Sequence, residues 1–298
     1  MNNSVKDMLA RYNCTSVTDY ENALKEIIQE IALLGLWRSK FFEQAAFYGG
    51  SALRVLYGLD RFSEDLDFSL LKKNPDFSIQ KYCNPIKKEL TSFGFSIKIE
   101  KKIKKKIKTN IDSAFIKAGT LENMIIIENS ESIRKKIHSN KVMKIKLEID
   151  INPPEGFQTE TKYIFQPLPF SVNSYILPHL FSGKMHAILC RSWNNRVKGR
   201  DWYDLVWFVG KNVSIGLKHL ENRMKQSGHL KKNQILTENL FRQIILEKIR
   251  SVDFNNAKKD VENFLKDSSS LELWSKEFFE TICEKIKIAE KEKNQTNY

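Results

Sequence analysis

The amino-acid sequence predicts an α+β fold, with a mixed-sheet N-terminal domain over residues 1–177 and an all-helical C-terminal domain over residues 178–298. Residues 95–175 consist of short segments rich in β-branched residues between polar turns, which is typical of strands. From Pro178 onward the apolar residues recur with the period of a helix. A length of 298 residues is sufficient for two domains, each with its own core.

The N-terminal elements follow from caps, glycines and apolar periodicity. Thr18 and Glu21 have capping-box spacing and predict a helix from about Asp19 to Leu34. We then expect a short helix over RSKFFEQ, a buried strand at AAFYG, a helix over Ala52–Tyr57 and a strand across EDLDFSLL. A helix over SIQKYCNPIKKELTSFG contains Pro85, which can kink it. The remaining strands are FSIKIEKKIKKKIK, SAFIKAGT, NMIIIEN, KVMKIKLEIDIN and TKYIFQPLPFSV.

The C-terminal domain is predicted from six segments with helical periodicity. These are PHLFSGKMHAILCR, RDWYDLVWFV, SIGLKHLENRMKQ, TENLFRQIILEKIRS, FNNAKKDVENFLKD and SLELWSKEFFETICEKIKIAEK.

Composition restricts the class of partner and the compartment. A net charge of +13 favours a polyanionic partner such as nucleic acid, although charge alone carries no specificity. The apolar runs are short and interrupted by charge, and the N-terminus lacks the apolar core of a secretory signal. The four cysteines are scattered without a CxxC pair, so we expect reduced thiols of a cytoplasmic protein rather than a zinc site or disulfides. The histidines show no metal-ligand spacing, and His186 is interpreted as structural.

Two alternating aspartates are the strongest candidates for chemistry. In a strand, Asp65 and Asp67 point to one face while Leu66 and Phe68 point to the other. Two carboxylates held close together repel each other unless water or a cation lies between them. Mg²⁺ prefers such hard oxygen ligands, and pairs of Mg²⁺ ions commonly serve in-line displacement at phosphorus. A D-x-D pair alone is also compatible with a solvated strand face.

The segment before the aspartates favours a metal site over a solvated strand face. Gly49 and Gly50 allow a tight turn and close backbone approach to a ligand. Ser51 begins a helical segment, where backbone N–H groups and the helix dipole favour a phosphate. The combination predicts a phosphate cradle beside a metal site.

A third carboxylate is expected from the strand KVMKIKLEIDIN. Its isoleucines and Leu147 alternate with Lys146, Glu148 and Asp150. If this strand lies beside the first, Glu148 or Asp150 reaches the same metals, and the pattern does not choose between them.

These residues carry a family resemblance. GGSALRVLYGLDRFSEDLDF resembles the GS…D-x-D motif of polymerase-β-like nucleotidyltransferases. It resembles more closely the abortive-infection toxins of the AbiEii/AbiGii type, with their pattern Gly-Gly-Ser/Thr-x-Leu…Arg-x-Ser-x-Asp-Leu/Ile-Asp-Phe. KLEI at 146–149 is similar to the second block of that family, and KMHAILCRSWNNRVKGRDWYDLVWF at 184–208 to the third.

The resemblance implies a nucleotidyltransferase domain that transfers a nucleoside monophosphate from an NTP with Mg²⁺, two ions being expected. It implies a toxin with a cognate antitoxin, acting in a toxin–antitoxin or phage-defence system, in some members on tRNA. By motif position it assigns the triphosphate to Gly50 and Ser51, with Arg61 and Ser63 in the same motif, and the metals to Asp65 and Asp67. It assigns a phosphate contact to Lys184 and an additional essential carboxylate to Asp201.

The helical pattern agrees with this assignment. Lys184 and Arg191 are spaced i, i+7 and share one stripe of a helix. Lysine suits triphosphate oxygens as a point charge, while Arg191 or Arg196 can hold them bidentately. Asp201 begins the next helix and is interpreted as a base or as a residue supporting the metal ligands. Without the motif, Lys184 and Asp201 would be read as surface residues.

The sequence therefore predicts a Mg²⁺-dependent nucleotidyltransferase that acts on RNA. The lysine-rich run at 98–108 is equally compatible with a tract for RNA phosphates and with a solvated strand edge. One alternative is an antibiotic-type, small-molecule nucleotidyltransferase, although the positive charge would repel a cationic aminoglycoside. Another is a non-catalytic RNA- or partner-binding module, which the intact set of motif residues disfavours.

Overall fold

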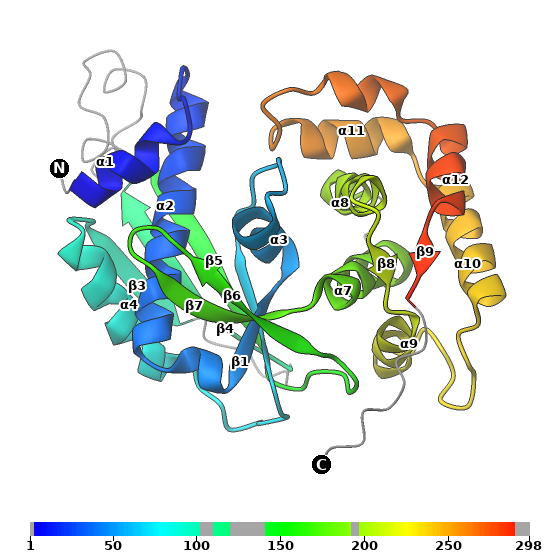
Figure 1. Ribbon diagram of the computed structural model, residues 1–298, viewed down its shortest axis with the longest axis horizontal. Helices are drawn as coiled ribbons and strands as arrows, with labels where there is room; N and C mark the ends of the chain where they lie inside the picture. Colours follow the sequence, from blue (N-terminus) through cyan, green and yellow to red (C-terminus); the bar gives the residue numbers. More distant parts are fainter. Residues whose placement is uncertain (1–2, 102–109, 120–140, 192–196, 290–298) are drawn as a thin grey trace. The chain divides into compact units, whose positions relative to one another are not determined.

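The computed structural model describes residues 3–101, 110–119, 141–191 and 197–289 (Figure 1). The chain forms two compact units. The first comprises residues 1–58, 62–153 and 159–174, and the second comprises residues 59–61, 154–158 and 175–298. Sheet in the first unit and helices in the second confirm the predicted fold class. Two short segments of the N-terminal half, 59–61 and 154–158, belong to the helical unit.

A seven-stranded mixed sheet forms the centre of the first unit, in the order β3-β4-β5-β2-β1-β7-β6. Strands β1 and β2 are antiparallel, whereas β2 and β5 are parallel. The strands are β1 (Ala45–Tyr48), β2 (Leu66–Leu70), β3 (Ile97–Lys101), β4 (Ile111–Gly119), β5 (Val142–Asp150), β6 (Thr159–Ile164) and β7 (Phe170–Tyr175). The expected strand NMIIIEN and residues 102–109 of the lysine-rich run lie outside the described residues.

The main helix of this unit is α2 (Val17–Arg38), which is longer than the sequence pattern predicted. Its capping box consists of Ser16 and Asp19, so the predicted pair of Thr18 and Glu21 was wrong by two residues. Helix α2 packs against α4 (Gln80–Ser92), and Figure 1 shows the two side by side over the sheet. A Cβ on Gly35 would lie 3.0 Å from the Ile86 Cα, so the glycine permits this close approach.

The core of the first unit lies between these helices and one face of the sheet. Helices α1 (Asn3–Ala10) and α3 (Gly49–Tyr57) complete the unit, with a single 3₁₀ turn, η1 (Phe41–Glu43), where a short helix was expected. Leu66 and Phe68 of β2 and Leu147 and Ile149 of β5 are fully buried in this core. Their neighbours along the strands therefore point to the opposite face.

The second unit is helical, with a two-stranded pairing of β8 (Ser214–Ile215) and β9 (Lys287–Ile288). Stacked and edge-on aromatic rings of Trp202, Phe254 and Phe279 fill its core. The expected helix over SLELWSKEFFETICEKIKIAEK is interrupted, because Ser275 caps a new helix with a bond from the Phe278 N–H. The helices are α7 (Leu177–Cys190), α8 (Gly199–Gly210), α9 (Leu217–Gln226), α10 (Glu238–Ser251), α11 (Phe254–Glu262) and α12 (Lys276–Glu284), with the 3₁₀ turn η2 (Ser269–Leu273). Across the described ranges, every helix is too short or too polar to cross a membrane.

Candidate active site

The two motif aspartates lie where strand β2 begins. Asp67 is the second residue of β2, and Asp65 directly precedes the strand. Both side chains are half-buried, whereas Leu66 between them is fully buried. The observed strand starts at Leu66, whereas the predicted strand EDLDFSLL started at Glu64. The predicted alternation of the aspartates with buried residues is present.

The first turn of α3 lies directly against Asp67. Tyr48, the last residue of β1, is the register partner of Asp67, and α3 begins at the next residue, Gly49. Gly49 has a φ of +84°, and a Cβ there would lie 2.5 Å from the Asp67 Oδ2. Only glycine fits this conformation and this proximity. The helix begins three residues before the expected Ala52, so Gly50 and Ser51 are part of its first turn.

Ser51 connects this turn to the other aspartate. Its side chain is completely buried and its hydroxyl donates a hydrogen bond to the Asp65 carbonyl. The hydroxyl proton is therefore used to fix the backbone at Asp65, a positioning role that the sequence pattern did not indicate.

The register of β2 and β5 distinguishes the two candidates for the third carboxylate. Asp67 is paired with Glu148, and Ser69 with Asp150. Register partners on neighbouring strands point to the same face, so the Glu148 side chain stands beside that of Asp67. Asp150 is two residues, or about 6.5–7 Å, further along the strand. Its Oδ1 accepts a hydrogen bond from the Asn152 N–H at 3.0 Å.

Carboxylate oxygens are the kind of ligand that Mg²⁺ prefers. Asp65, Asp67 and Glu148 offer hard oxygen ligands on half-buried side chains, which leaves room for water and phosphate oxygens. Lys146 forms an ion pair with Glu148 at 2.6 Å, so its ammonium group balances part of the negative charge of these carboxylates.

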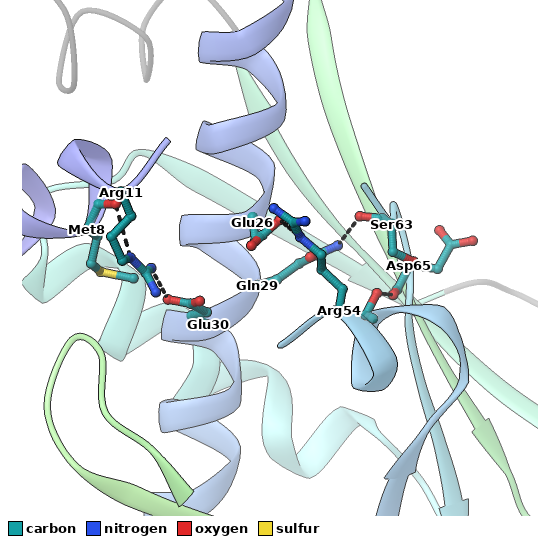
Figure 2. Close-up of polar contacts among 9 residues, drawn as sticks. Met8, Arg11, Glu26, Gln29, Glu30, Arg54, Ser63 and Asp65 are labelled. Carbon is teal, nitrogen blue, oxygen red and sulfur yellow. Dashed lines mark hydrogen bonds and ion pairs between the residues drawn. The ribbon is translucent and has the colours of Figure 1, made fainter. Parts of the chain in front are cut away.

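Polar side chains of α2 support the segment before Asp65, as Figure 2 shows. Gln29 donates from its Nε2 to the Ser63 carbonyl at 3.1 Å, which fixes the backbone two residues before Asp65. Arg54, on α3, donates to Glu26 at 2.9 Å. Ser63 is thus held through its backbone. The sequence signal for Gln29 and Glu26 was their position as polar residues in the largely apolar segment 23–36.

A second ion pair lies one helical turn from Glu26. Arg11, which follows α1, donates to the buried Glu30 of α2 at 2.7 Å, and Figure 2 shows this pair at some remove from Asp65. Burial raises the pKa of Glu30 to about 7, although Arg11 opposes the shift. Burial of the Tyr12 side chain, together with the charges of Glu26 and Glu30, raises the pKa of Tyr12 above its usual range.

In the second unit, Arg61 is bound into a buried charge network. Its Nε and Nη2 donate to the two carboxylate oxygens of Asp204, each at 2.6 Å. The side chains of Arg61 and Asp204 are 2% and 0% exposed. Arg61, which the motif associated with the nucleotide, therefore has its guanidinium occupied by Asp204. The second aspartate of the Arg-Asp-x-x-Asp-Leu block was the signal for Asp204, which sequence reasoning left without a role.

Lys184 and Asp201 belong to the same network. The Lys184 Nζ lies 2.7 Å from the Asp204 Oδ2 and 3.3 Å from the Asp201 Oδ1, and Arg191 is 3.7 Å from Asp201. Burial alone would raise the pKa of Asp201, but Lys184, Lys198, Arg191 and Arg61 together hold it below its usual value. Asp201 is therefore a carboxylate at neutral pH and a weak proton acceptor. Arg196 lies outside the described residues.

Comparison with known proteins places these features in a family. The family described as "Nucleotidyl transferase AbiEii toxin, Type IV TA system" matches residues 31–284. Among solved structures, JHP933 from Helicobacter pylori is similar at 17% identity, covering 87% of this chain and 89% of its own, with a TM-score of 0.48. A "putative nucleotidyltransferase from H. pylori" is similar at 17% identity over 86% of this chain and 90% of its own, with a TM-score of 0.46. None of the curated proteins matches the chain.

The family match spans the Gly-Gly-Ser turn, the D-x-D strand, its neighbour β5 and helices α7 and α8. The chain belongs to the AbiEii family of nucleotidyltransferase toxins of type IV toxin–antitoxin systems.

Proposed function

We propose that this toxin transfers a nucleoside monophosphate from a Mg²⁺-bound NTP to a hydroxyl of RNA, with tRNA as the acceptor. The observation that carries the proposal is that Asp67, its register partner Glu148 and the first turn of α3 lie together where the central strand β2 begins. The acceptor oxygen forms a bond to the α-phosphorus, and the bond from that phosphorus to the bridging oxygen of pyrophosphate breaks.

The residues of the first unit divide this task. Asp65, Asp67 and Glu148 would hold Mg²⁺, which supplies charge stabilisation at the reacting phosphate and activates the acceptor oxygen. The backbone of Gly49 and Gly50 in the first turn of α3 is suited to the triphosphate. Ser51 and Gln29 act as positioning residues, because their bonds to the Asp65 and Ser63 carbonyls fix the chain that carries the aspartates.

The roles of the second unit rest on the family motif. For Lys184 we keep the expected role of contacting a phosphate. For Asp201 we keep the expected role of an additional essential carboxylate. Because its pKa is depressed by the surrounding cations, we propose that Asp201 orients Lys184 rather than acting as a general base. Arg61 contributes through the fold of this unit, since Asp204 occupies its guanidinium.

The acceptor class is supported by charge. At +13 the chain favours a polyanion and disfavours a cationic small molecule such as an aminoglycoside. As a type IV toxin, it also has a cognate antitoxin as its partner.

The test is transfer from α-³²P-labelled NTPs. The full-length protein is incubated with each labelled NTP, Mg²⁺ and total cellular RNA, and compared with Asp65→Asn and Asp150→Asn. Asp150→Asn is the matched control because it removes the same charge from the same sheet face, two residues from Glu148. We expect label in a tRNA-sized band with the wild type and with Asp150→Asn, and none with Asp65→Asn.

Each other outcome is informative. Label on a small molecule or a protein, with none on RNA, contradicts the acceptor. Failure of the wild type to bind Mg²⁺-NTP favours the non-catalytic alternative. Equal transfer by Asp65→Asn contradicts the assigned site.

A further inference from the structure

Three side chains with metal-binding atoms converge in the second unit. They are His186 and Cys190 of α7 and His229, which follows α9. One ligand atom from each lies within 4.8 Å of those from the other two. The proposed transfer reaction uses none of these residues.

The local sequence explains how they meet. His186 and Cys190 are four residues apart on α7 and therefore lie on the same helical face. Helix α9 ends at Gln226 with Ser227 as its C-cap, and Gly228 follows with a φ of +78°, which reverses the chain. The His229 N–H then bonds to the Met224 carbonyl at 2.9 Å, which fixes the turn that carries the imidazole. Sequence spacing did not predict the cluster because this turn comes from a different helix.

The ligand atoms face a common point. The Ser227 hydroxyl lies 2.9 Å from the His186 Nε2 and 3.0 Å from the His229 Nδ1. Two imidazole nitrogens are thus directed at a single small polar group, and the Cys190 ligand atom lies within 4.8 Å of theirs.

This donor set matches zinc in chemistry and in size. Imidazole and thiolate suit Zn²⁺ and disfavour Mg²⁺, which prefers oxygen. Tetrahedral Zn²⁺ with bonds of about 2.0–2.3 Å places its N and S ligand atoms roughly 3.3–3.6 Å apart. The ligand atoms now lie within 4.8 Å of one another, so metal binding would draw the side chains closer together, with the Ser227 hydroxyl or a water in the fourth position.

The electrostatic setting determines the protonation of the ligands. Burial lowers the pKa of His186, and Arg223, His229 and Arg191 act in the same direction. Burial raises the pKa of Cys190 to about 11, while Lys248 and Arg223 act in the opposite direction. Metal binding therefore releases the thiol proton to solvent, as is usual for cysteine ligands.

We propose that His186, Cys190 and His229 form a zinc site that ties α7 to the turn after α9. The site is independent of the proposed function, because it shares no residue with the aspartates or with the ion-pair network of Asp204. The competing interpretation is a buried thiol beside a His–Ser–His hydrogen-bond cluster without affinity for metal.

The experiment uses the full-length chain without an affinity tag and Co²⁺ as a spectroscopic substitute for zinc. Excess Mg²⁺ is present to occupy the carboxylates of the first unit. We expect one equivalent of Co²⁺ to give the sulfur-to-cobalt charge-transfer band and the intense visible bands of tetrahedral cobalt, all removed by one equivalent of Zn²⁺. Cys190→Ser should lose the charge-transfer band, and His229→Ala should weaken Co²⁺ binding at least tenfold.

Cys283→Ser is the matched control, because Cys283 is another buried helical cysteine of the same unit and lies outside the cluster. It should keep the full spectrum. Zn²⁺ should also raise the melting temperature of the wild type and of Cys283→Ser, but not of Cys190→Ser. Absence of the charge-transfer band in the folded wild type, its persistence in Cys190→Ser or its loss in Cys283→Ser would each overturn the proposal.

Discussion

The two units hold their carboxylates in opposite ways. In the first unit, Asp65 and Asp67 are half-buried at the start of β2. In the second, Asp201 and Asp204 are buried, and the cations Arg61 and Lys184 lie against them. Both sets belong to motifs of the same family, so a motif aspartate does not by itself indicate which physical role it has.

Solvent access and charge balance separate these roles. A half-buried carboxylate can exchange water for a metal ion without a large change in its own solvation. A buried carboxylate between cations is costly to separate from them, because each charge left behind would be unpaired away from water. The difference predicts that neutralising an aspartate affects activity in the first unit and stability in the second.

The largest expected effect is on stability, from Asp204→Asn. The substitution leaves the shape nearly unchanged but removes the charge that balances Arg61 and Lys184, so we expect a loss of about 3–5 kcal/mol in the free energy of unfolding. Urea denaturation measures it. The exposed ion pair of Glu238 with Arg242 provides the control, and Glu238→Gln should cost less than about 1 kcal/mol. Similar losses in both variants would show that burial does not distinguish these pairs.

The next effect is on activity, from Asp67→Asn. Loss of a residue that only supports a metal ligand typically lowers metal affinity or activity about 10–100-fold. Loss of a metal ligand itself should lower activity more, so we expect the rate of nucleotidyl transfer to fall at least about 100-fold. The free energy of unfolding should stay within about 0.5 kcal/mol of the wild type, as for substitutions outside the core. Transfer rates and urea denaturation on the same preparation test both statements. A large loss of stability with proportionate loss of activity would assign Asp67 to the scaffold.

Local sequence patterns predicted the arrangement of the aspartates in the first unit better than that of the charged residues in the second unit. The alternation of Asp65 and Asp67 with core residues is a property of one strand, and it is readable from a few consecutive positions. The proposal of Glu148 rather than Asp150 as the third carboxylate depends on strand register, which is set by contacts between distant segments. Arg61 and Asp204 are 143 positions apart, so neither periodicity nor spacing relates them.

Gly49→Ala tests the close approach of α3 to Asp67, a proposed metal ligand. The new Cβ would meet the Asp67 Oδ2 at 2.5 Å in a backbone conformation with φ of +84°. We expect a loss of about 1–3 kcal/mol in stability, as for strained backbone, together with a clear fall in transfer rate as Asp67 is displaced. Gly58→Ala is the matched control, because Gly58 has a φ of +71° but a Cβ added there would meet no neighbouring atom within 4 Å. It should lose stability and keep its transfer rate, and equal rates in the two variants would contradict the contact with Asp67.

The smallest effect is a change in how stability depends on pH, from Glu30→Gln. Burial raises the pKa of Glu30 from 4.5 to about 7, so between these values the folded chain holds a proton that the unfolded chain has lost. The resulting stabilisation is complete below about pH 4.5 and disappears as the pH rises through about 7. Glu30→Gln removes this titration, so the stability of the variant relative to the wild type should rise between pH 5 and pH 7.5 and level off above it. Urea denaturation across this range measures the difference, with Glu43→Gln as the same substitution at an exposed site of the first unit. A difference that stays constant with pH would mean that Arg11 keeps Glu30 ionised throughout, which would make this pair resemble the balanced charges of Asp204 rather than a titrating group.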